Sequence, residues 1–329
     1  MEAGRYVLLA IGIDKSRGAN VPPQPFELGR GIYICQWTDD HAEAISKWAE
    51  LMECRRYRRA ADVRLRFMQV THCLLFHVDE PLSTLAFHDV IWPPTEVGAD
   101  PRLSQRFLRN RQMLTTLQAI MIAAPLNFGC VEHWLGVHIE DPAGISCREA
   151  MDVGWYGRGR LREMAADFDM DVLRKAELAL RGLEGCAGAL NARLTVVADA
   201  FARALMAEDW RFELMGLWVA MEALFGNVTQ EITHQVSERA AAFTLDPGPS
   251  RVERFKRLKK AYGVRSRVVH GTKVERPQDA DVELVEDTVR ASLLRVFSDE
   301  NLIELFSGSQ GALDEHFCQL VLAPTSAHP

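Results

Sequence analysis

The chain has 329 residues, of which 48% are apolar and 25% charged, a composition typical of globular proteins that excludes a largely disordered chain. The formal net charge of -7 excludes a surface coated in positive charge for sequence-independent nucleic-acid binding, so any nucleic-acid site must be a local patch. This length suffices for two domains, each with its own core.

The cysteines and apolar runs indicate the compartment. The seven cysteines form no CxxC pair, and their odd number favours reduced thiols over a disulfide framework. The first apolar run, residues 6–13, is too short to span a membrane, and no later run reaches about eighteen uninterrupted apolar residues. We therefore expect a soluble, cytoplasmic protein with no membrane partner.

The N-terminal half alternates short β-like runs with turn signals. Apolar and β-branched runs predict strands, and amphipathic runs predict helices. The predicted strands are residues 6–13, 31–37, 65–78 and 131–139, and the predicted helices are residues 41–59 and 103–122. The pattern therefore favours a mixed α/β domain over residues 1–155.

The composition changes near residue 161, where long runs rich in Ala, Leu, Arg and Glu begin. These runs predict helices at residues 171–185, 190–206, 210–225 and 231–245. Ser250 is expected to cap the next helix, from Arg251 into the Val268 region, and residues 281–297 form another with acidic residues near its start. We expect an all-α bundle over residues 156–310, a tail over residues 311–329, and an α+β fold overall.

The boundary is expected in residues 154–160, whose sequence is GWYGRGR. Its arginines and two aromatic side chains suit base stacking or a phosphate contact. Because the segment is so short, a flexible linker is the simpler interpretation.

A basic stretch lies between Arg251 and Lys273. It contains nine Lys or Arg residues and one acidic residue, Glu253. A solvated helix face would explain such a run. Because the run ends in Arg265, His270 and Gly271, however, we favour a polyanion site. The RNA-binding candidates are Arg254, Arg257, Lys259, Lys260, Arg267 and Lys273.

An arginine and a histidine suffice to cleave RNA without a metal. The histidine accepts the proton of the 2′-hydroxyl as that oxygen attacks phosphorus. The guanidinium meets the charge that develops on the phosphate. DNA lacks this hydroxyl, so the reaction selects RNA.

Geometry sets a condition on Arg265 and His270. Residues five apart in a regular helix point about 140° apart around its axis. The two side chains converge only if the helix ends between them, and Gly271 is typical of the position just past a helix C-terminus.

Three blocks resemble the HEPN superfamily, and within it the ApeA-like HEPN domains. They are residues 217–226 (LWVAMEALFG), residues 237–241 (SERAA) and residues 262–271 (YGVRSRVVHG). The resemblance covers roughly residues 165–305, most securely 210–272.

The resemblance implies a helical bundle that dimerises so that two R-x4-6-H motifs line one cleft, acting as a metal-independent endoribonuclease, often in antiphage defence or toxin systems. Arg265 and His270 would be the catalytic pair, with the second His270 of the dimer as general acid. Many active members carry Asn, Asp or His after the arginine, whereas this chain has Ser266.

Glu222 lies in an almost wholly apolar stretch, so it is expected to be buried beside a cation, either Arg239 or Arg265. We favour an ion pair that positions the catalytic arginine, and direct catalysis by Glu222 is the alternative.

Other chemistry lacks sequence support. The histidines of the pairs His72 and His77, and His133 and His138, are five apart in strand-like runs, which places them on opposite faces of a sheet. No Walker loop, GxGxxG after a strand or GxSxG is present. We therefore expect no metal and no cofactor.

The leading hypothesis is a homodimeric cytoplasmic ribonuclease in defence or stress response, whose N-terminal domain senses a protein or nucleic-acid trigger or positions the target. The alternative is a catalytically inactive HEPN module for dimerisation or RNA binding. A third hypothesis makes the N-terminal domain the active part.

Overall fold

The computed structural model describes residues 4–13, 25–29, 31–36, 38–39, 43, 72–77, 115–125, 128–129, 133–141, 144–152, 169–186, 192–207, 209–226 and 232–322. The chain divides into two compact units, one of Met1–Leu117 and Leu126–Glu177, the other of Gln118–Pro125 and Leu178–Pro329. The first contains a β-sheet and the second is helical, so the layout is α+β. The sequence placed the division at residue 155, and segment 154–160 lies outside the described residues.

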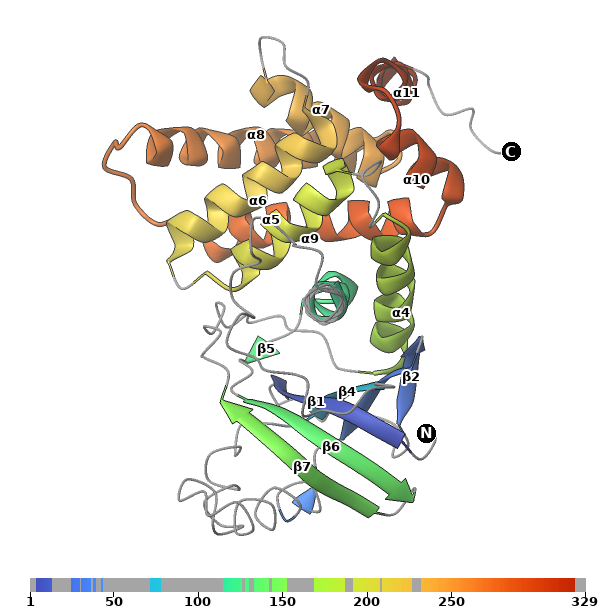
Figure 1. Ribbon diagram of the computed structural model, residues 1–329. Helices are drawn as coiled ribbons and strands as arrows, with labels where there is room; N and C mark the ends of the chain where they lie inside the picture. The colour runs from blue at the N-terminus through green and yellow to red at the C-terminus, as the bar shows by residue number, and fades with distance from the viewer. Residues whose placement is uncertain are drawn as a thin grey trace, which may run out of the picture. The chain divides into compact units, whose positions relative to one another are not determined.

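The first unit contains an antiparallel sheet (Figure 1). Its described strands are β1 (Gly4–Ile13), β2 (Phe26–Gly29), β3 (Ile32–Gln36), β4 (His72–His77), β5 (Phe128–Gly129), β6 (His133–Asp141) and β7 (Gly144–Asp152). They are ordered β2-β3-β4-β1-β6-β7, and β5 pairs with the end of β1. The register aligns Leu8 of β1 with Leu75 of β4 and with Leu135 of β6.

The sheet agrees with the sequence in its central strands. The runs at residues 6–13, 31–37 and 131–139 coincide largely with β1, β3 and β6, and β4 occupies the described part of the run at residues 65–78. The edge strands β2 and β7 were not predicted. The helix expected at residues 41–59 falls almost wholly outside the described residues, and the described helix at residues 115–123 overlaps the one expected at 103–122.

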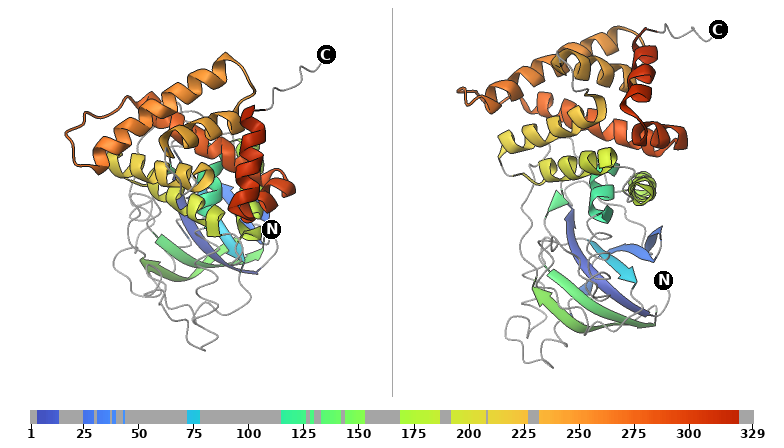
Figure 2. Two further views of the ribbon diagram at one scale, coloured as in Figure 1. Left: turned by 90° about the horizontal axis from the view of Figure 1, so that it is seen from above. Right: turned by 45° about the horizontal axis from the view of Figure 1, so that its top comes forward.

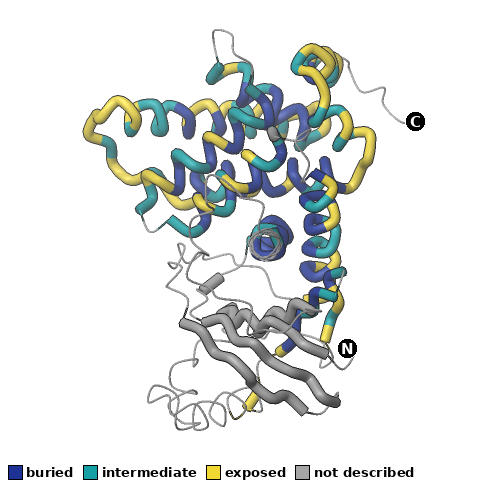
Figure 3. Tube along the Cα trace, viewed as in Figure 1, coloured by how far each residue is buried: buried dark blue, intermediate teal, exposed yellow. Residues whose placement is uncertain are grey.

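The second unit is a helical bundle (Figures 1 and 2). Its helices are α4 (Met170–Gly185, shared with the first unit), α5 (Ala192–Leu205), α6 (Trp210–Phe225), α7 (Ile232–Thr244), α8 (Pro249–Val269), α9 (Asp279–Phe297), α10 (Glu300–Ser307) and α11 (Gln310–Leu322). The helix α6 packs against α5, α7, α8 and α9. It is therefore the central helix of the bundle. Figure 3 shows the buried residues along it in dark blue.

Aromatic side chains fill the core of the bundle. The rings of Phe225, Phe243, Phe306 and Phe317 lie with centroids 5.5 to 6.1 Å apart in tilted or edge-on pairs. All four are fully buried. Because they come from α6, α7, α10 and α11, the last two helices complete this core.

Two sequence expectations for the bundle were wrong. Residues 311–329 were expected to form a tail, but α11 extends to Leu322 and buries Phe317. Ser250 was expected to cap α8, but it lies inside the helix, whose N-cap is Gly248 and whose first residue is Pro249. Proline suits that first position because its missing N–H would have no partner there. The acidic start expected for α9 is confirmed by Asp279 and Asp281.

Candidate functional site

The helix α8 carries most of the candidate residues, and its C-terminus fixes their directions. The amide of Gly271 donates to the Val268 carbonyl at 3.1 Å, and that of Thr272 donates to the Arg267 carbonyl at 3.0 Å. Together with the positive φ of 68° at Gly271, these bonds form a Schellman motif. The expected glycine stop is therefore confirmed, with His270 as the C-cap.

This end corrects the geometric expectation for the catalytic pair. The helix extends to Val269, so it does not end between Arg265 and His270. The helical path turns the two residues about 140° apart around the axis. Within one chain, α8 therefore directs them to different faces.

Arg265 faces α6, where it meets Glu222. Its Nη2 lies 3.2 Å from Oε1 and 3.5 Å from Oε2 of the carboxylate. Both side chains are 23% exposed. The shorter contact is a charge contact without hydrogen-bond alignment, because Oε1 of Glu222 and Nε of Arg265 have no hydrogen-bond partner among the described residues. Of the two partners expected for Glu222, the structure brings Arg265 to it.

Two aromatic residues lie beside this pair, although neither was expected to belong to the site. The Tyr262 ring lies 5.4 Å from the Arg265 guanidinium carbon, and Trp218 meets that ring edge-on at 4.9 Å. Burial, followed by the nearby Glu222 carboxylate, raises the pKa of Tyr262. Helical spacing is the signal that points to them, since Tyr262 precedes Arg265 by three residues and Trp218 precedes Glu222 by four.

Arg239, the other supporting candidate, belongs to a different cluster. It donates to Oδ1 of Asp314 at 2.7 Å and to the carbonyl of Phe225 at 3.3 Å. Its guanidinium also lies 5.1 Å from the centre of the Phe317 ring. Arg239 therefore fastens α11 to the end of α6.

Three of the RNA-binding candidates face α9. Arg254 donates to Oγ1 of Thr288 at 3.3 Å, and Arg257 donates to the carbonyl of Ala280 at 3.0 Å. Lys260 pairs with Asp281 at 3.3 Å, although its side chain is 70% exposed. These contacts hold α8 against α9. Of the three side chains, that of Lys260 stays largely open to solvent.

The other candidates lie toward solvent. Lys259, Arg267 and Lys273 are exposed, as is Lys256, which was not among the candidates, and none has an acidic partner within the described residues. Residues 256, 259, 263, 267 and 270 recur every three or four positions, so they share one face of α8. His270 therefore belongs to the outer basic face, defined by these five positions, and Arg265 belongs to the opposite one. Ser266 lies between the two, and its carbonyl accepts the His270 amide.

The described part of the chain offers no candidate metal site and no candidate membrane span. It holds no group of three or more His, Cys, Asp or Glu side chains placed for a metal ion. The side chains of the strand histidines lie outside the described residues. None of the described helices has both the length and the apolar character needed to cross a membrane.

The chain was compared with protein-family models, curated proteins and solved structures, and none of them matches it. Any functional interpretation therefore depends on the geometry of the site itself.

Proposed function

We propose that the helical unit is a metal-independent endoribonuclease of the HEPN type, acting as a homodimer with Arg265 and His270 as its catalytic residues. The observation that carries the proposal is the position of Arg265. Glu222 orients its guanidinium at a partly open site, on the helix that also presents a basic outer face. This arrangement is suited to binding the phosphate of a polyanion.

The surroundings of the ion pair favour a second copy of the chain as partner. Val219, one turn before Glu222, is 43% exposed, and Val269, one turn after Arg265, is 51% exposed. Phe212, seven residues before Val219 on the same side of α6, is 65% exposed. Exposed apolar side chains beside a half-buried charged pair are typical of an interface. Because Arg265 and His270 diverge within one chain, a second copy would supply the histidine that meets each arginine.

The proposed reaction uses the two groups in separate roles. A neutral His270 accepts the 2′-hydroxyl proton, and the second His270 of the dimer donates a proton to the leaving 5′-oxygen. Arg265 stabilises the charge that develops on the phosphate. Glu222 holds Nη2 of Arg265, whereas Nη1 makes no hydrogen bond within the described residues, so the guanidinium keeps a donor for phosphate.

RNA would approach along the outer basic face of α8. Lys256, Lys259 and Arg267 supply charges there, and Lys273 supplies one just past the helix. Gly263, in the middle of this face, leaves room for a phosphate backbone, because a Cβ added to it would meet only Nη1 of Arg267, at 3.9 Å. We assign the sheet-containing unit the role of sensing a trigger or positioning the target, in a cytoplasmic defence or stress response.

One observation favours a second candidate, an inactive HEPN module for dimerisation or RNA binding. Arg265 already has a carboxylate and an aromatic ring as partners, which satisfies a purely structural role. Both candidates predict RNA binding by α8, and cleavage distinguishes them.

The test is cleavage of single-stranded RNA by the full chain in EDTA. We expect cuts that disappear where the substrate carries a single 2′-deoxynucleotide, and a loss on the order of a hundredfold or more for His270→Ala. The matched control is His234→Ala, because His234 is also exposed but lies on α7. Equal cleavage by wild type and His270→Ala would overturn the catalytic assignment. RNA binding without cleavage by any of these proteins would favour the inactive module.

A further inference from the structure

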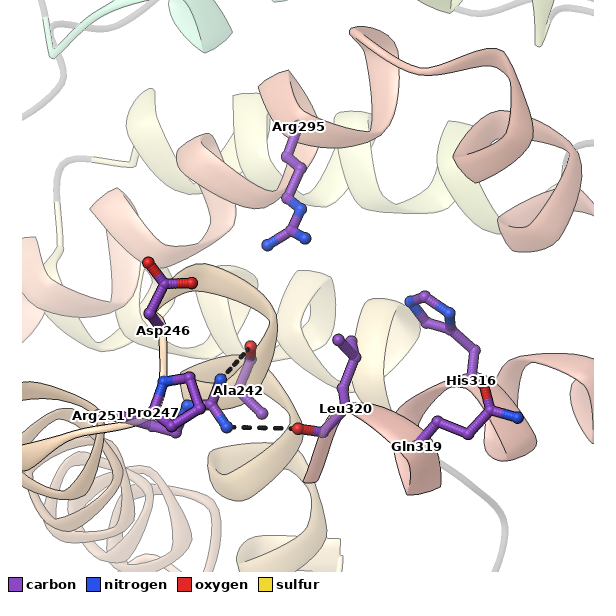
Figure 4. Close-up of a pocket in the computed structure, with 8 residues that line it drawn as sticks. All are labelled: Ala242, Asp246, Pro247, Arg251, Arg295, His316, Gln319 and Leu320. Atoms are coloured by element: carbon purple, nitrogen blue, oxygen red, sulfur yellow. Dashed lines mark hydrogen bonds between the residues drawn. The ribbon is translucent and has the colours of Figure 1, made fainter. Parts of the chain in front are cut away.

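A cavity of about 340 Å³ lies within the helical unit, away from the Arg265 site. Figure 4 shows the residues that line it, which come from the end of α7 and the loop after it, α8, α9 and α11. They are Ala242, Asp246, Pro247, Arg251, Arg295, His316, Gln319 and Leu320. The volume is at the small end of the range for ligand pockets, so the cavity suits a small ligand.

Arg295 is the main cationic group of the cavity. Its Nη1 donates to the carbonyl of Phe243, and its guanidinium carbon lies 4.6 Å from the centre of the Phe243 ring. These contacts fix the guanidinium and leave Nε and Nη2 as further donors. Figure 4 shows it reaching from α9 into the space that Asp246, Leu320 and His316 surround.

Arg251 provides a second guanidinium from another side. It donates to the carbonyl of Leu245 at 2.8 Å, to that of Leu320 at 3.3 Å and to that of Ala242 at 3.4 Å. It thereby caps the last turns of α7 and α11 and is held rigidly. A guanidinium has five N–H groups, so two of them are not used by these three bonds.

His316 adds an imidazole that makes no ion pair within the described residues. Its Nε2 is shielded from solvent and has no hydrogen-bond partner among the described residues. Burial, and then the charge of Arg295, lowers the pKa of His316, so the ring is neutral at pH 7. The lining therefore carries two fixed positive charges and one carboxylate, that of Asp246.

This balance indicates an anionic ligand, because the cavity is locally positive in a chain of net charge -7. The cationic groups approach from different sides, which matches a tetrahedral anion better than a planar carboxylate. Pro247 and Leu320 supply an apolar wall on which an organic group can rest. We propose that the cavity between α7, α8, α9 and α11 binds a phosphate group, either free or as the phosphomonoester of a small molecule.

The test is calorimetric titration of the full chain at pH 7 and constant ionic strength, with inorganic phosphate, cytidine 5′-monophosphate and acetate as separate ligands. We expect saturable binding of phosphate, and tighter binding of the nucleotide would identify an organic phosphate as the ligand. Arg295→Gln should weaken binding by about tenfold or more, because it removes the central guanidinium. Arg203→Gln is the matched control, since Arg203 is exposed on α5 and has no partner among the described residues.

A second variant covers the case in which Arg295→Gln disturbs the fold through the lost bond to Phe243. Asp246 is exposed and makes no ion pair within the described residues, so Asp246→Asn should leave the fold intact and tighten phosphate binding several-fold. Absence of saturable phosphate binding, unchanged affinity in both variants, or acetate binding as tight as that of phosphate would overturn the proposal. None of these readouts depends on ribonuclease activity.

Discussion

Nη2 of Arg265 lies 3.2 Å from Oε1 of Glu222, while His270, five residues further along, caps the same helix on a different face. Although the two residues belong to one sequence motif, α8 therefore directs their side chains to different faces. Arg265 belongs to the α6–α8 contact and His270 to the outer basic face. This division generates the first two predictions.

The Glu222–Arg265 contact should contribute measurably to stability. Glu222→Gln keeps the shape of the side chain but leaves a half-buried guanidinium without its counter-charge. We expect the free energy of unfolding in urea to fall by about 1–2 kcal/mol. Glu304→Gln is the control, because Glu304 is exposed on α10 and its side chain has no partner among the described residues.

A double-mutant cycle with Arg265→Gln isolates the pairwise interaction. The double variant should lose less than the sum of the two single variants. Additive losses would show that the 3.2 Å contact makes no pairwise contribution to stability.

The divergence within α8 predicts complementation between two inactive variants. If each site joins Arg265 of one copy to His270 of the other, a mixed dimer of Arg265→Ala and His270→Ala chains keeps one such pair but lacks the second His270, the proposed acid. Random mixing of the two variants should therefore raise RNA cleavage above that of either variant alone, up to about a quarter of the wild-type level. Cleavage that stays at the level of the separate variants would contradict a site shared between copies.

The same model makes Val269 an interface residue. Val269→Lys should shift sedimentation toward the monomer without unfolding the chain, because Val269 is 51% exposed in one copy. Val252→Lys is the control, since Val252 is also 51% exposed on α8 but lies in its first turn. An equal shift in both variants would argue against an interface at the Arg265 end.

Much of the helical unit could be predicted because its signals are local. The range of α6 follows from an apolar run preceded by Asp209, whose side chain accepts the Arg211 amide as an N-cap. The end of α8 follows from Gly271, where a positive φ suits glycine.

The helices α10 and α11 were missed although their caps are visible in the sequence. Asp299 accepts the Asn301 amide at 2.9 Å, and Ser309 accepts the Ala312 amide at 3.3 Å. Their role in the core could not be predicted, because it depends on Phe306 and Phe317 meeting rings that are distant in sequence. The edge strands β2 and β7 were missed because a strand with one neighbour is under less pressure to be apolar.

The site shows the same contrast. Sequence spacing identified Arg265, His270 and Glu222 but left two partners open for the carboxylate. The choice between them depends on tertiary packing. Because α6 packs on α8, Glu222 pairs with Arg265, whereas Arg239 pairs with Asp314. Helical periodicity already implied that Arg265 and His270 diverge unless the helix ends between them. Because α8 extends to Val269, the two side chains do diverge.

Gly263 should separate stability from RNA binding. It lies inside α8 with open space at its Cβ position, so Gly263→Ala should stabilise the fold by about 0.5–1 kcal/mol. If a phosphate backbone passes over this face, the same variant should bind RNA more weakly in a filter-binding assay. Gly182→Ala is the contrasting case, because its Cβ would meet the Phe297 ring at 2.3 Å and should lower stability. Unchanged RNA affinity in a stabilised Gly263→Ala chain would move the RNA path away from this face.

His316 should make the fold less stable in mild acid. Burial and Arg295 lower its pKa in the folded chain, whereas the unfolded chain takes up the proton near pH 6.5. The unfolded state therefore binds more protons as the pH falls below about 6.5, so the free energy of unfolding declines until the folded-state pKa is passed. The charged groups that line the cavity with His316 are Arg295, Arg251 and Asp246, and they remain in His316→Gln. Urea unfolding at pH 7.5, 6.5 and 5.5, in buffer without phosphate, should show a smaller loss of stability in this variant than in the wild type. Equal losses in the two proteins would mean that His316 takes up its proton equally in the folded and unfolded chains.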